Sequence, residues 1–198
     1  MRRAFLQWPR TAGELTADGV RILAVVSVLA GAIWWTPTDA GILAFALPAT
    51  LLPRFLSVRP GFDIAYGITI LVAAWSNVLD LYTSIAWWDL AVHFVATGVV
   101  AAMLCVLLSR WGVVVWQPET RSMRRVPLIV VPVLALAISA LWEMVEWFGY
   151  TFISDDIFVA YADTIGDMVV GGLGGVVAGV VTAFVPLGVR ARVAVDDR

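Results

Sequence analysis

The sequence predicts an all-α, polytopic membrane protein: a compact bundle of six transmembrane helices with both termini on the cytoplasmic side. The first observation is composition, because 61% of the 198 residues are hydrophobic and only 14% are charged, with a mean hydropathy of +0.90. Soluble domains are about 45–50% apolar and roughly 25% charged. The second observation is a set of six long apolar segments, and the third is the placement of the arginines between them. A net charge of −2 favours no nucleic-acid partner. Because the composition is so apolar, the lipid bilayer is the expected partner.

Six segments approach the roughly 20 mainly apolar residues that a helix needs to cross a bilayer. The second segment is the least regular, because Pro48 and Pro53 interrupt it. Prolines are tolerated in membrane helices when neighbouring groups satisfy the backbone atoms that they free. The connections are short and no linker is visible, so residues 1–198 are expected to form a single integral-membrane domain with neighbouring helices antiparallel. The predicted spans are approximately residues 20–36, 40–57, 62–85, 87–109, 126–150 and 160–187.

The arginines support six spans rather than five or seven. All 13 basic residues are arginines, and the six-span arrangement puts every one on the same side of the membrane. Loops rich in arginine and lysine face the cytoplasm, so both termini are predicted to be cytoplasmic. The residues are Arg2, Arg3, Arg10, Arg21, Arg54, Arg59, Arg110, Arg121, Arg124, Arg125, Arg190, Arg192 and Arg198.

The first span has an alternative interpretation. The stretch RILAVVSVLAGA resembles the core of a signal peptide followed by a cleavage site at Ala30–Ala32, which would remove residues 1–32. The apolar run continues past this point to Trp35, and the core begins late in the chain. These two features favour an uncleaved transmembrane span.

Acidic residues gather on the opposite, outer side of the six-span arrangement, where no arginine accompanies them. The only histidine, His93, is expected among them. The nine outer acids are Asp39, Asp80, Asp89, Glu143, Glu146, Asp155, Asp156, Asp163 and Asp167. Six of these are predicted to lie within helices near the outer ends of spans three to six, namely Asp80, Asp89, Glu143, Glu146, Asp163 and Asp167.

The spacing of these residues predicts that they converge. Three pairs have members three or four residues apart, so each pair shares one helix face. The pairs are Asp89–His93, Glu143–Glu146 and Asp163–Asp167. Asp80 extends a polar stripe in span three that begins with Ser76 and Asn77. The sixth span also carries a double GxxxG pattern, which lets helices approach closely, and its members are Gly171, Gly175 and Gly179.

Electrostatics limits what such a cluster can be. One charge near the bilayer centre costs about 2.5–3.5 kcal/mol on insertion scales. Two like charges 4 Å apart repel by about 4 kcal/mol at an effective dielectric constant of 20. Several carboxylates with only His93 as a basic neighbour therefore need either protons or a bound cation. A mixed carboxylate and imidazole set suits a divalent metal ion such as zinc, iron, manganese or magnesium.

Simpler interpretations exist for each residue taken alone. Asp80, Asp89 and Asp163 would also be ordinary helix-end residues facing interfacial water, and His93 would be a hydrogen-bonded core histidine. Ionisable residues inside membranes are seldom without a function. The combination of acids at one depth therefore favours a functional site over a set of unrelated side chains.

Three motifs around these residues resemble those of the YjdF-like family of bacterial inner-membrane proteins. The stretches WWDLAVHFVATG, LWEMVEWFGY and ADTIGDMVVGGLGG are similar to the family patterns D-x3-H-F-x2-G, E-x2-E-W and D-T-x2-D-M. The glycine of the first pattern is displaced to Gly98, and the loop before Asp163 is shorter than in the family. The resemblance implies a compact multi-span helical protein of the bacterial plasma membrane without implying a reaction. A fainter likeness to VanZ-like membrane proteins adds little.

Three functions remain open at this point. The first is a metal centre in a membrane-embedded hydrolase acting on a lipid or small molecule from the outer leaflet, with Glu146 as general base. The second is cation or proton transport through the same acids. The third is a structural or accessory role in which the polar residues only fix helix packing. The expected metal ligands are Asp89, His93, Glu143, Glu146, Asp163 and Asp167.

Overall fold

The computed structural model describes residues 6, 8–116, 121–153 and 159–188, and these residues form a helical bundle. Six helices are long and apolar enough to cross a membrane. They are α2 (Ala12–Trp34), α3 (Pro37–Leu56), α4 (Pro60–Val78), α6 (Trp88–Arg110), α7 (Arg125–Phe152) and α8 (Tyr161–Phe184). Two short helices complete the described part, α5 (Leu81–Ser84) and the 3-10 helix η1 (Arg121–Arg124). The predicted six-span helical fold is confirmed.

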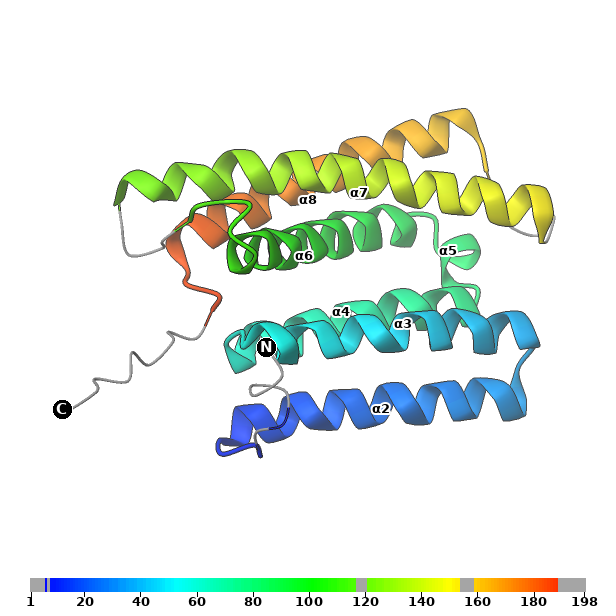
Figure 1. Ribbon diagram of the computed structural model, residues 1–198. Helices are drawn as coiled ribbons and strands as arrows, with labels where there is room; N and C mark the ends of the chain where they lie inside the picture. Colours follow the sequence, from blue (N-terminus) through cyan, green and yellow to red (C-terminus); the bar gives the residue numbers. More distant parts are fainter. Residues whose placement is uncertain (1–5, 7, 117–120, 154–158, 189–198) are drawn as a thin grey trace.

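The bundle consists of two groups of three helices. Helices α2, α3 and α4 pack on one another, as do α6, α7 and α8, and the groups meet mainly through α4 and α6 (Figure 1). At one end, the backbone amide of Arg59 donates to the carbonyl of Leu187 at 2.7 Å. At the other end, Trp88 Nε1 donates to Ser76 Oγ at 2.8 Å. These two contacts tie the groups together at opposite ends of the bundle.

Local capping extends the first two spans beyond the predicted bounds. Thr11 and Glu14 form a capping box at the start of α2, so this helix begins eight residues before the predicted residue 20. Thr36 and Asp39 form the same motif at the start of α3. The outer acid Asp39 therefore has a local structural role. Helix α2 packs against α3 and α4.

The third predicted span is too long, because α4 ends at Val78 rather than residue 85. Asp80 adopts a left-handed conformation with φ of 54°. Its carbonyl accepts hydrogen bonds from the hydroxyls of Thr83 (3.0 Å) and Ser84 (2.7 Å), which begins the separate helix α5. Asp80 is exposed outside the helix, so the prediction that it shares the intramembrane polar stripe is wrong. Of that stripe only Ser76 is buried.

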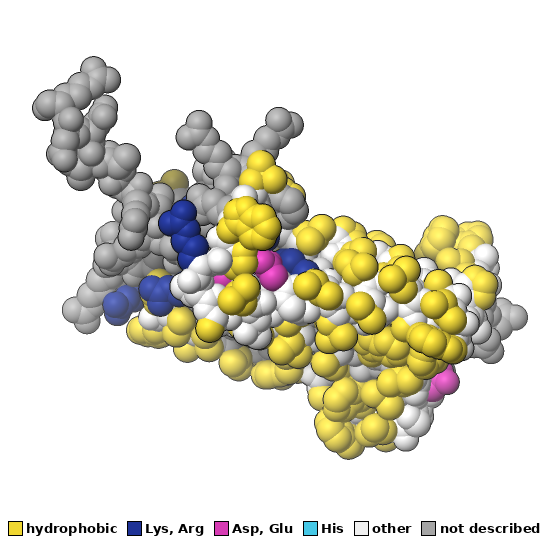
Figure 2. Space-filling view, turned by 90° about the horizontal axis from the view of Figure 1, so that it is seen from below, with side chains coloured by type: hydrophobic (Ala, Val, Ile, Leu, Met, Phe, Trp, Pro, Cys, Tyr) yellow, Lys and Arg dark blue, Asp and Glu magenta, His cyan; other side chains and the backbone are white. Residues whose placement is uncertain are grey.

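The surface between the two ends of the bundle is apolar. Figure 2 shows one face on which hydrophobic side chains cover most of the length, while arginine side chains gather toward one end. Exposed side chains include Val133 and Leu141 on α7 and Phe184 on α8. In water such a surface would drive aggregation, whereas in a bilayer it contacts lipid chains. The surface agrees with a multi-pass membrane protein.

Arginines and outer acids lie at opposite ends of the bundle. The described arginines lie just before and in the first half of α2, in the last turn of α3 and the α3–α4 connection, at the end of α6, in η1 and at the start of α7. Successive spans run antiparallel, so these segments share one end (Figure 1). Arg2, Arg3, Arg190, Arg192, Arg198, Asp155 and Asp156 lie outside the described residues. The partition predicted from the sequence therefore holds for the arginines that the structure describes.

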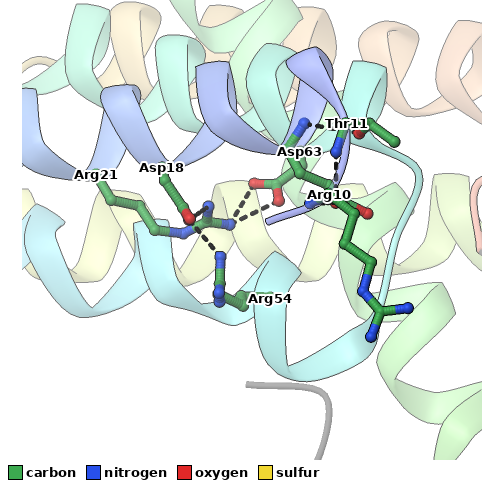
Figure 3. A network of polar contacts seen from close by, with 7 residues as sticks. Arg10, Thr11, Asp18, Arg21, Arg54 and Asp63 are labelled. Carbon is green, nitrogen blue, oxygen red and sulfur yellow. Dashed lines mark hydrogen bonds and ion pairs between the residues drawn. The ribbon is translucent and has the colours of Figure 1, made fainter. Parts of the chain in front are cut away.

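Four residues at the arginine end form a network of ion pairs (Figure 3). Arg21 Nη2 contacts both carboxylate oxygens of Asp63 at 2.6 Å, and Arg21 Nη1 contacts Asp18 Oδ1 at 2.9 Å. Arg54 Nη1 pairs with the same Asp18 oxygen. Two acids and two arginines balance locally, and the network joins α2, α3 and α4. The predicted span 20–36 puts Arg21 in its first turn, whereas in α2 Arg21 lies in the third turn, with only 8% of the residue exposed.

Glycines let α8 approach both of its neighbours. A Cβ atom on Gly174 would lie 1.9 Å from the carbonyl oxygen of Phe94 on α6. A Cβ atom on Gly175 would lie 2.2 Å from the Cβ of Ala135 on α7. Association of helices in lipid depends on such close packing, because lipid tails are as apolar as the side chains. The close contact predicted from the GxxxG pattern is confirmed.

Replacing Gly174 with alanine is expected to destabilise the protein by about 1–3 kcal/mol, because the added methyl forces the α6 and α8 backbones apart. The matched control is Gly19→Ala, where a Cβ atom meets nothing within 4 Å and stability should be kept or slightly raised. The measurement is unfolding by SDS in mixed micelles, followed by tryptophan fluorescence. A Gly174→Ala protein as stable as wild type would contradict the packing.

Replacing Arg21 with methionine is expected to cost about 3–5 kcal/mol, because the largely shielded Asp63 carboxylate loses its main partner. Adding Asp63→Leu to this variant should recover part of the loss. Arg10→Met serves as the control, since Arg10 is exposed and its replacement should change stability by less than about 0.5 kcal/mol. The same SDS titration measures all three, and equal losses for Arg21→Met and Arg10→Met would refute the role of the network.

Candidate metal centre

The predicted site residues lie on three adjacent helices at the end of the bundle opposite the arginines. Asp89 and His93 lie in the first two turns of α6, and Asp163 and Asp167 in the first two turns of α8. Glu143 and Glu146 lie toward the end of α7, which runs antiparallel to the other two. Close packing of α8 against both α6 and α7 brings these pairs to the same level. The site is therefore built by three helices, not by four as the sequence had suggested.

The first group of potential ligands joins α6 and α8. Asp89, His93 and Asp167 each offer a ligand atom, and these atoms all lie within 4.8 Å of one another. His93 Nε2 lies 3.5 Å from Asp89 Oδ1. His93 is 7% exposed and Asp167 only 1%, whereas Asp89 is half-buried. The helices thus present an imidazole and two carboxylates to a common point.

The second group joins α6 and α7. His93, Glu143 and Glu146 also offer ligand atoms within 4.8 Å of one another. Trp142 Nε1 donates to Glu146 Oε1 at 2.8 Å, which holds the half-buried Glu146 side chain. The imidazole of His93 belongs to both groups and has two ring nitrogens, so one can bind a metal while the other pairs with a carboxylate.

Asp163 lies at the edge of the site. It belongs to neither group of ligand atoms within the described part of the chain. Its carboxyl is nevertheless close enough to interact electrostatically with Asp89, His93 and Glu143. Of the predicted ligands, five are therefore brought together and Asp163 flanks them.

The buried carboxylates fit a metal ion. Among the described residues, Asp167 Oδ1 and Glu143 Oε1 are buried and have no hydrogen-bond partner. A buried polar atom left without a partner costs about 1–3 kcal/mol, and more when it is charged. Metal–oxygen and metal–nitrogen bonds of about 2.0–2.6 Å place ligands up to about 4–5 Å apart across one ion, which matches the separations in each group. A cation held by either group would therefore give a partner to the buried carboxylate of that group, Asp167 in the first and Glu143 in the second.

Polar residues continue one helical turn, about 6 Å, below this level. They are Thr97, four residues after His93, and Ser139, four before Glu143, and both lie against Gly171, four after Asp167. A Cβ atom on Gly171 would lie 2.1 Å from Ser139 Oγ and 3.1 Å from Thr97 Oγ1, so the three residues meet. Ser139 is fully buried, and its hydroxyl has no partner in the described part of the protein.

One further turn down, the polar column ends. Ala101 and Ala135 are fully buried at this level, and Gly175 packs directly on Ala135. These residues carry no polar side-chain atom. The site is thus a column of polar side chains that begins at the acid end and stops near the middle of the bundle.

Tyr82 is a neighbour of the site that the sequence analysis missed. Its hydroxyl donates to the carbonyl of Ala73 at 3.0 Å, which fastens α5 to α4. Burial raises the pKa of the Tyr82 phenol, and the nearby charges of Asp89 and Glu146 raise it further. The phenol therefore stays protonated as a donor beside the acids. No local pattern signals it, whereas the i±4 spacing from His93 and Glu143 would have indicated Thr97 and Ser139.

Comparison with known proteins gives a family without an assigned activity. Residues 19–187 match the model of a family described as "Predicted membrane protein (DUF2238)". Searches of curated proteins and of solved structures each found no significant match. The matched range contains all six candidate ligands and most of the six spans. The chain belongs to the DUF2238 family of membrane proteins.

Proposed function

We propose that the acid and histidine groups of this site bind a divalent metal ion and that the protein is a membrane-embedded, metal-dependent enzyme, most simply a hydrolase. The observation that carries the proposal is the pair of ligand groups that share His93, together with the unpartnered oxygens of Glu143 and Asp167. When bound, the ion would act as a Lewis acid on a water molecule or a substrate oxygen. Zinc, iron, manganese and magnesium all accept part or all of this donor set.

The residues divide into different roles in this proposal. Asp89, His93 and Asp167 would hold the ion from α6 and α8, and Glu143 would complete the ligand set from α7. Glu146 is half-buried and kept in place by Trp142, so it would accept the proton of the attacking water. Asp163, which belongs to neither ligand group among the described residues, would attract the cation toward the two groups.

The column of polar side chains stops inside the bundle, and this favours an enzyme over a transporter. A proton or cation pathway needs polar groups across the whole membrane. Below Ser139 the column meets Ala101 and Ala135, and the acids of the opposite half, Asp18 and Asp63, are engaged by arginines. Continuity of the polar path is therefore missing among the described residues of this core. Transport through the same acids is the weaker alternative.

A purely structural role is also less well supported. Interhelical hydrogen bonds in membranes contribute only about 0.6 kcal/mol on average. Glycine contacts already fix α8 against α6 and α7, as at Gly174 and Gly175. Buried acids with unpartnered oxygens would weaken a scaffold rather than strengthen it.

The orientation and location of the site belong to the same proposal. The positive-inside rule would put the arginine end and both termini in the cytoplasm, so the acidic site would lie toward the outer face of the membrane. The motif resemblance and the family match together support a YjdF-like protein of the bacterial inner membrane. The substrate would then be a lipid or a small molecule of the outer leaflet.

Metal analysis of the purified protein tests the proposal. Wild-type protein is expected to retain roughly one equivalent of a divalent metal, and His93→Ala should lose it because the imidazole belongs to both ligand groups. The matched control is Asp80→Asn, which removes an exposed acid outside the site and should keep the metal. Size-exclusion chromatography verifies that each variant is folded. Wild type without stoichiometric metal, and no difference in His93→Ala, would remove the proposal.

A further inference from the structure

We propose that an apolar furrow between α4 and α6 binds one acyl chain of a zwitterionic, amine-bearing phospholipid and places the head group of this lipid next to the acidic site. This inference rests on the proposed function and names the substrate class of that site. The furrow has a volume of about 250 Å³. It is lined by Ile68, Thr69 and Val72 of α4 and by Trp88, Ala91 and Val95 of α6.

The walls of the furrow favour an apolar occupant. Its polar side chains are already engaged, because the Thr69 hydroxyl donates to the carbonyl of Ala65 at 2.8 Å and Trp88 Nε1 donates to Ser76 Oγ. An occupant therefore finds hydrophobic contact without a free hydrogen-bonding side chain along these walls. The volume exceeds the roughly 150 Å³ of an engineered apolar cavity that binds benzene. A segment of a hydrocarbon chain matches both the chemistry and the size.

The direction of the furrow connects it to the site. From Val95 to Trp88 it follows α6 for about two turns, roughly 10 Å along the helix. Asp89, a candidate ligand, follows Trp88 directly in the sequence at the acid end of the bundle. An acyl chain lying in the furrow would therefore place the ester groups and the head group of its lipid next to the acidic site.

Charge complementarity selects the head group. Besides the proposed metal ligands, the acid end carries Asp163 and Glu146, with no arginine in the described residues around them. An anionic head group would be repelled there unless the metal neutralised it fully. An ammonium group is attracted by the remaining carboxylates, while the phosphate of the same lipid would face the cation.

Photolabelling tests this assignment. Wild-type protein in phosphatidylcholine vesicles is given a trace of phosphatidylethanolamine with a diazirine in the middle of one acyl chain, and labelled peptides are mapped by mass spectrometry. Labels are expected on the facing segments of α4 and α6 in several-fold excess over the lipid-facing side of α7. Excess phosphatidylethanolamine should suppress this labelling, whereas phosphatidylglycerol should not. Equal competition by the two lipids would overturn the head-group assignment.

Two substitutions fill the furrow and one serves as control. Ala91→Phe and Val95→Phe should each abolish the excess labelling, while Ala137→Phe, the same change on the exposed face of α7, should leave it unchanged. Labelling spread evenly over α4, α6 and α7, or undiminished in both filled variants, would overturn the inference.

Metal content separates this inference from the proposed function. Val95→Phe should keep the metal of wild type, since Val95 is exposed and lies outside the ligand groups. His93→Ala should lose the metal and keep the acyl-chain labelling. Wild type without metal but with labelled furrow residues would refute the enzyme proposal alone, whereas metal retention with evenly spread labels would refute the lipid seat alone.

Discussion

Compensation of charge in a medium of low dielectric constant is the constraint on which this structure depends. An unpaired carboxylate inside a bilayer is costly, and several together are costlier because they repel one another. At one end of the bundle the protein compensates its own acids, since Arg21 and Arg54 neutralise Asp63 and Asp18. At the other end the described residues include no such arginine, and compensation must come from protons or from an ion.

The two groups of helices divide these tasks. Helices α2, α3 and α4 are joined by the internally balanced ion pairs, whereas α6, α7 and α8 are joined by glycine contacts and carry all the candidate ligands. Close packing through Gly174 and Gly175 aligns the three acidic helix ends at one level. The looser contact between α4 and α6 leaves the apolar furrow, and Trp88, which lines it, directly precedes Asp89 in the sequence. Site and furrow thus arise from the same division of the bundle.

Much of the fold and of the candidate site follows from sequence patterns. Length and hydropathy identify six spans, and the i,i+3 and i,i+4 spacings identify the residue pairs because helical geometry fixes which positions share a face. The start of α2 was missed because its first two turns are polar and depend on the Thr11–Glu14 capping box. The break at Asp80 was missed because hydroxyl groups of the following turn stabilise a left-handed backbone that hydropathy does not register.

The remaining differences between the predicted and the observed positions of residues come from contacts between helices. The partnership of Asp18 with Arg54 crosses from α2 to α3, and no local spacing encodes it. Asp163 has the right spacing from Asp167, yet the rotation of α8 leaves it at the edge of the ligand groups that the described residues form. Tyr82 approaches the acids only because α5 folds back on α4. Periodicity predicts which side chains share a face, but contacts between helices decide which of them meet.

X-ray absorption at the zinc edge, recorded on protein loaded with one equivalent of zinc, tests most directly whether the acids share a cation. A shared cation site should give oxygen and nitrogen ligands at about 2.0–2.2 Å, with the outer-shell scattering of a single imidazole. That imidazole signature should disappear in His93→Ala. A spectrum of zinc surrounded by water alone, or one unchanged by His93→Ala, would contradict the account.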